Sequence, residues 1–135
     1  MKRILLLVTI CLLGLSAWAT HIVGGEFKLT HVENFKYTLT MNLYFDDVNG
    51  NRSASDIEAF VSIFEKGSNK FIRKVQLNKK STGDVPYSNP DCAVGSLKTL
   101  LLIYSEDIEL PANVYNNPSG YYVVWERCCR NNVIT

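Results

Sequence analysis

The sequence predicts an all-β domain, specifically an antiparallel β-sandwich of immunoglobulin-like type with about six or seven strands. Residues 36–45, KYTLTMNLYF, alternate apolar and polar side chains without a break, as a strand with one buried face does. Clusters of turn-forming residues recur between segments of this kind. No stretch sustains the period of an amphipathic helix, so the whole chain favours strands.

The expected strands follow one another in order along the chain. The first covers residues 21–31, in which Gly24-Gly25 suggests a bulge or a close backbone approach. The others are residues 36–45, 59–65, 71–77, 97–110 and 121–129, and residues 97–110 fit either one long strand or two strands with a bend. Turn residues predict loops at 46–55, 81–91 and 111–120, and a tight turn at 66–69. In residues 36–45 the side chains expected to face the core are Tyr37, Leu39, Met41, Leu43 and Phe45.

Residues 1–19 predict a secretory signal peptide. Lys2 and Arg3 precede a short apolar run, and Ala17 and Ala19 are small residues at the positions that a signal peptidase reads. The run is shorter than the roughly 20 residues that span a bilayer, so no membrane span is expected after cleavage before Thr20. Cleavage would leave 116 of the 135 residues. Lys2 and Arg3 would be lost, so 12 of the 14 basic residues would face 13 acidic ones, a net charge near −1. That balance argues against nucleic-acid binding.

The cysteines are expected to form a disulfide, because exported proteins keep cysteines paired. Cys92, Cys128 and Cys129 remain after signal cleavage, an odd number. Neighbours on a strand point to opposite faces, so we expect Cys92 to pair with either Cys128 or Cys129, and the sequence does not choose between them. A redox role is the alternative, since Arg127 and Arg130 flank the vicinal pair and would favour a thiolate.

The loop that begins at Asp47 has the oxygen spacing of a calcium loop. Oxygen-bearing side chains alternate along it and a glutamate closes the series: Asp47, Asn49, Asn51, Ser53, Ser55 and Glu58. Arg52 stands where the sharp turn needs glycine, and the flanking segments are strands rather than helices. The alternative is a hairpin turn at Asn49-Gly50 that joins two neighbouring strands.

Two further groups of side chains are candidate sites. Tyr115, Tyr121, Tyr122 and Trp125 would suit an aromatic platform that stacks sugars, although core filling is the more common use of such residues. The carboxylates of Glu106, Asp107 and Glu109 raise the alternative of a small glycan-active enzyme, and Asp107 and Glu109 would share one face of a strand.

Residues 22–25, IVGG, match the first residues of a mature trypsin-like protease, but that interpretation fails. Such an enzyme needs a histidine, an aspartate and a serine in a set order, and His21 and His31 are the only histidines. THIVGGE at residues 20–26 and YYVVWERCCRN at residues 121–131 instead resemble the amino-terminal region of gliding-motility-associated surface proteins, which leave the cell through the type IX secretion system.

This resemblance covers nearly all of the mature chain. It implies a secreted or cell-surface, adhesin-like module without catalytic residues, and a partner that is an extracellular protein or polysaccharide. It also implies cysteines where this chain has Asp47 and near Lys98, so a lost partner at Asp47 would explain the odd cysteine count. Proteins of this kind continue for hundreds of residues to a sorting domain, so a fragment, a truncated product or a stand-alone form is expected here. We therefore expect a non-enzymatic binding or structural domain.

Overall fold

The computed structural model describes residues 22–50, 55–88 and 98–127, and in these ranges the chain is all-β with no helix. Six strands follow one another along the chain: β1 (Ile22–Glu33), β2 (Lys36–Asp46), β3 (Glu58–Glu65), β4 (Phe71–Asp84), β5 (Thr99–Glu109) and β6 (Tyr121–Trp125). The predicted signal peptide and all four cysteines lie outside the described residues.

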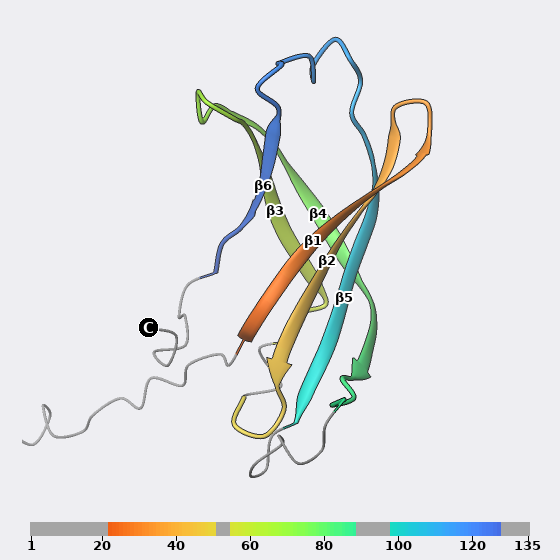
Figure 1. Ribbon diagram of the computed structural model, residues 1–135, viewed down its shortest axis with the longest axis vertical. Coiled ribbons are helices and arrows are strands. Elements are labelled where there is room, and N and C mark those ends of the chain that lie inside the picture. The colour runs from red at the N-terminus through yellow and green to blue at the C-terminus, as the bar shows by residue number, and fades with distance from the viewer. Residues whose placement is uncertain (1–21, 51–54, 89–97, 128–135) are drawn as a thin grey trace, which may run out of the picture.

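All six strands belong to one antiparallel sheet with the order β1-β2-β5-β4-β3-β6. The sheet is strongly curled, so that β1, β2 and β5 pass in front of β3 and β4 (Figure 1). Strands β4 and β5 pair only from Asn78 and Ser105 towards the lower end of the view, and beyond this point they separate. The predicted all-β fold is confirmed, whereas its arrangement as a sandwich of immunoglobulin-like type is not.

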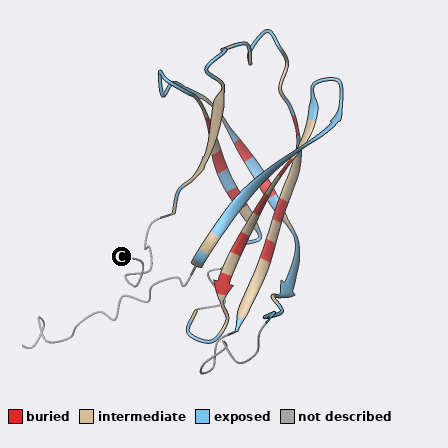
Figure 2. Cartoon of the chain, viewed as in Figure 1, coloured by how far each residue is buried: buried red, intermediate tan, exposed pale blue. Residues whose placement is uncertain are grey.

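The core lies on the inner face of this curled sheet. Its buried side chains come from four strands: Leu39, Met41, Leu43 and Phe45 of β2, Ala59, Val61 and Ile63 of β3, Val75 and Leu77 of β4, and Leu102, Tyr104 and Ile108 of β5. Buried positions alternate with intermediate or exposed ones along these strands, as the period of two requires (Figure 2). The prediction for β2 is therefore confirmed, with Tyr37 partly buried at its end.

The structure corrects or settles the predicted bounds of three strands. Strand β4 continues to Asp84 through residues 81–84, which the sequence predicts as loop, because Ser81 to Asp84 pair with β5. These residues are exposed, so no apolar alternation marks them. Residues 99–109 form one long strand rather than two. The final strand is described as far as Trp125, and Glu126 and Arg127 follow it outside the sheet.

The segment between β2 and β3 is a crossover and not a hairpin, so the alternative of an Asn49-Gly50 hairpin is wrong. β2 lies between β1 and β5, and β3 lies between β4 and β6. A turn does form after β2, where the Asp46 carboxylate accepts hydrogen bonds from the amides of Val48 (2.9 Å) and Asn49 (3.1 Å). Gly50 then passes so close that a Cβ there would lie 2.2 Å from the Asp46 carbonyl oxygen.

Candidate binding surface

Strand β6 divides the predicted aromatic residues between the two faces of the sheet. Its register places Tyr121 and Trp125 on the inner face, with Trp125 opposite the buried Val61. Tyr115 meets Tyr121 edge-to-face at 4.9 Å between ring centroids, and both pack against the core. The Tyr121 hydroxyl donates to the Val114 carbonyl at 3.1 Å, which ties the 111–120 loop to the strand. Three of the four predicted residues are thus partly buried and pack against the core.

Tyr122 points the other way and joins an aromatic cluster on the outer face of the sheet. Its ring stacks on Phe64 at 5.4 Å between centroids and 17° between planes, and Phe71 meets Phe64 edge-on at 5.7 Å. The Tyr122 hydroxyl donates to Asn69 Oδ1 at 2.9 Å in the β3–β4 turn, which fixes its ring. We call Phe64, Phe71 and Tyr122 the outer aromatic cluster.

Two large rings of this surface are exposed to solvent. Phe71 is 53% exposed, and Phe60, further along the same strand as Phe64, is 45% exposed. The Lys74 ammonium lies 5.2 Å from the centre of the Phe60 ring, within reach of a cation–π interaction. Sequence reasoning missed Phe60, Phe64 and Phe71. The signal was present in residues 59–65, AFVSIFE, because Val61 and Ile63 occupy the alternate positions that face the core.

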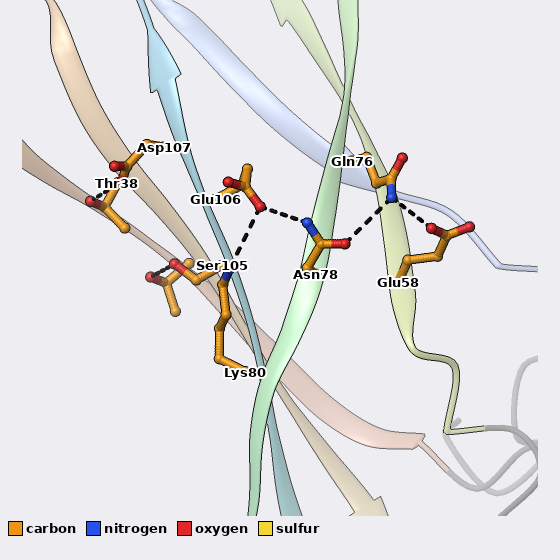
Figure 3. A network of polar contacts seen from close by, with 9 residues as sticks. Thr38, Glu58, Gln76, Asn78, Lys80, Ser105, Glu106 and Asp107 are labelled. Atoms are coloured by element: carbon orange, nitrogen blue, oxygen red, sulfur yellow. Dashed lines mark hydrogen bonds and ion pairs between the residues drawn. The ribbon is translucent and has the colours of Figure 1, made fainter.

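Linked polar side chains run from β3 through β4 to β5, and two separate polar pairs join β5 to β2 (Figure 3). Gln76, opposite Phe60 in the strand register, donates to Glu58 Oε2 at 2.6 Å. Asn78 donates to Glu106 Oε2 at 2.6 Å at the point where β4 and β5 separate. Further along, Thr38 donates to Asp107 and Thr40 contacts Ser105. The linked set therefore begins beside exposed Phe60, where the amide of Gln76 and the carboxylate of Glu58 lie.

Glu106, Asp107 and Glu109, the carboxylates of the catalytic alternative, do not supply the paired acid and base that a glycosidase needs. The Asn78 amide and then the Lys80 ammonium, 3.6 Å from Glu106 Oε2, lower the pKa of Glu106 below its usual value. A lowered pKa favours the ionised form, whereas a glycosidase acid needs a raised one. Asp107 is exposed and bonded to Thr38, and Glu109 is exposed at the end of β5.

The candidate calcium ligands that the structure describes have separate partners. Asp47 pairs with Lys98, Asn49 donates to Asp46 Oδ2 at 2.9 Å, and Glu58 accepts from Gln76. Asn51 lies outside the described residues. Within the described ranges, no three histidine, cysteine, aspartate or glutamate side chains gather as a metal site would need. The calcium loop stays a prediction.

Asp47 and Lys98 are joined although they lie in segments far apart in the sequence. The carboxylate of Asp47 is 3% exposed and lies 3.1 Å from the Lys98 ammonium, and the Asp47 amide donates to the Lys98 carbonyl at 2.8 Å. The hydrogen bond to Asp47 raises the pKa of Lys98 most, and the hydrogen bond to Asp84 is the second cause. An ion pair thus joins Asp47, where the resemblance implies a cysteine, to Lys98, near which it implies another.

The predicted cysteine sites, Cys92, Cys128 and Cys129, lie outside the described residues, so the disulfide stays a prediction. Arg127, whose charge supports the redox alternative, lies with its guanidinium 2.8 Å from the Asp56 carboxylate. This contact compensates part of the positive charge on which a reactive thiolate would depend.

Comparison with protein-family models, curated proteins and solved structures gives no match to this chain. The likeness to gliding-motility-associated surface proteins is therefore an interpretation of the two terminal motifs alone. Among the described residues, no helix is both long and apolar enough to cross a membrane.

Proposed function

We propose that this chain is an exported, non-catalytic module that binds an extracellular partner through the outer face of its sheet. The observation that carries the proposal is the surface in which exposed Phe71 meets the ordered rings of Phe64 and Tyr122, with exposed Phe60 further along the same strand as Phe64. Soluble proteins rarely leave several large rings together on the surface unless a ligand or partner covers them. Export is supported by the predicted signal peptide at residues 1–19.

A polysaccharide is the partner that this surface fits best. Aromatic rings offer flat apolar faces to the C–H side of a sugar ring, and amides and carboxylates accept or donate hydrogen bonds to its hydroxyls. Both kinds of group occur side by side here, because Phe60 lies opposite Gln76, which begins the polar network. A protein partner would also use aromatic residues with a polar rim around them, and it is the alternative that the capture experiment tests.

The test is a capture experiment on a panel of soluble and insoluble polysaccharides, with extracellular proteins as a second panel. We expect the mature chain to be retained on at least one polysaccharide and to leave it chemically unchanged. Retention on proteins alone would replace the polysaccharide with a protein partner. Retention on neither panel would contradict a binding function.

The competing enzymatic function is tested in the same panel. Glycan cleavage that disappears when Glu106, Asp107 or Glu109 is changed to alanine would overturn the non-catalytic proposal. We expect no cleavage, because the pKa of Glu106 is lowered by Asn78 and Lys80. This favours the ionised carboxylate rather than a proton donor.

The association with gliding motility and type IX secretion belongs to the same proposal and is supported by residues 20–26 and 121–131. An antibody to this domain distinguishes the possible forms on blots of cells and of medium. A band at the size of the mature chain supports a free secreted domain. A much larger, cell-bound band supports an amino-terminal module of a surface protein.

The sandwich arrangement is the structural part of the proposal. We infer that β1, β2 and β5 act as one layer and β4, β3 and β6 as the other. Buried side chains of both halves, such as Leu39 and Val61, belong to one core, which supports this view. Interproton contacts between the methyl groups of the two halves would test it in solution, and their absence would contradict it.

A further inference from the structure

Strand β1 leaves both its outer edge and much of its inner face uncovered. It is the first strand in the sheet order, so no other described strand pairs with its second edge. Phe27 and Leu29 lie opposite the buried Met41 and Leu39, yet they are 39% and 51% exposed. Apolar side chains thus extend the inner face beyond the part that the described residues cover. An exposed strand edge with apolar side chains is a template for pairing with another strand.

The middle of β1 is regular, and its ends are not. Register irregularities occur between Ile22 and Gly24 and again between His31 and Glu33. Bulges at the ends of an edge strand confine pairing to the segment between them, because they twist the strand away. Residues 24–31 are therefore the part of β1 that is able to accept a second strand.

Charges in this segment match a second copy of the same strand. Glu26 and Lys28 lie opposite Asn42 and Thr40 on the outer face, on either side of Phe27. Glu26 accepts hydrogen bonds from neutral donors, Asn42 at 3.0 Å and Tyr44 at 3.3 Å. Among the described residues, neither Glu26 nor Lys28 has an ion-pair partner.

We propose that two copies of this chain pair antiparallel through β1, about a two-fold axis at Phe27. In this register Glu26 of each copy lies opposite Lys28 of the other, so both pairs across the axis are attractive. Phe27 meets Phe27 of the other copy on the inner face, and Leu29 lies opposite Gly25, where no side chain obstructs it. A two-fold interface of this kind is self-complementary and closes at the dimer. The two sheets become one continuous sheet of twelve strands.

Sedimentation of the mature chain over a wide concentration range tests the proposal. We expect a reversible monomer–dimer equilibrium for the unchanged chain. Glu26→Lys and Lys28→Glu each place like charges opposite each other in both pairs. Either change should weaken dimerisation by about tenfold or more, since cross-strand charge pairs contribute to sheet pairing. Lys66→Glu, in the β3–β4 turn, makes the same charge change as Lys28→Glu and should leave the equilibrium unchanged.

Mixing the two variants gives the decisive result. A chain with Glu26→Lys places two lysines opposite the two glutamates of a chain with Lys28→Glu, so the mixture should form a heterodimer at concentrations where neither variant dimerises alone. The double variant, Glu26→Lys with Lys28→Glu, should recover the dimer. Unchanged far-ultraviolet spectra and melting midpoints would show that the single variants are folded. A monomer at every concentration, or no heterodimer on mixing, would overturn the proposal.

Discussion

Leu29 and Leu39 face each other across β1 and β2 and provide a matched test of where the core ends. Leu39 is 1% exposed and surrounded by the core, whereas Leu29 is 51% exposed on the same inner face. Changing Leu39 to alanine removes buried methyl groups and leaves a cavity, which costs about 2–5 kcal/mol of unfolding free energy. Folding removes only about half of the Leu29 side chain from water, so Leu29→Ala should cost about 1 kcal/mol of unfolding free energy.

The assay is urea unfolding of both variants and the unchanged chain, followed by tryptophan fluorescence. It should be run at a concentration where sedimentation shows monomers, because pairing through β1 would cover Leu29. Equal losses in the two variants would refute the conclusion that the inner face of β1 is uncovered in a single chain. A loss below about 1 kcal/mol at Leu39 would refute the placement of the core itself.

Three further predictions concern the loops and the polar network. Gly50→Ala should cost about 1–3 kcal/mol of unfolding free energy, because its Cβ would lie 2.2 Å from the Asp46 carbonyl oxygen. Gly83→Ala is the control, since a Cβ there has nothing within 4 Å, and thermal melts should show a far smaller loss. Glu106 has a lowered pKa, so its stabilising contacts should persist above the usual glutamate pKa and disappear as the pH falls through the lowered value. The difference in melting midpoint between the unchanged chain and Glu106→Gln should therefore vanish in acid, and a difference that grows there would contradict the assignment. A chelator should leave the melting midpoint unchanged, since Asp47 and Glu58 have protein partners; a lower midpoint would establish the calcium loop.

The alternation of side chains was enough to predict the strands that carry the core. In β2 and β3 every second residue is apolar and buried, so period and face follow directly from the sequence. The end of β4 was not predictable in this way, because Ser81 to Asp84 are exposed on both faces and carry no apolar signal. Their strand conformation depends on pairing with β5, a partner distant in sequence.

The candidate surface was predictable only in part for a similar reason. Tyr121 and Tyr122 are adjacent and identical in type, so the sequence cannot say which one faces the core until the register with β3 is known. The outer aromatic cluster also needs the β3–β4 bulge between Ile63 and Phe64, which places Phe64 opposite Phe71. Likewise, β2 meets β5 and not β3, so the Asp47–Lys98 pair depends on the order of strands in the sheet.

The central claim is that the outer face of the sheet, with its outer aromatic cluster, binds a polysaccharide. Two phenylalanines of equal exposure test it directly. Phe71 and Phe35 are both 53% exposed, but Phe71 belongs to the outer aromatic cluster and Phe35 lies in the turn between β1 and β2. Affinity for the captured polysaccharide should be measured by titration calorimetry for Phe71→Ala and Phe35→Ala. We predict a loss of about tenfold or more for Phe71→Ala, as expected for an aromatic contact, and no change for Phe35→Ala. Equal affinities for both variants and the unchanged chain would contradict the claim.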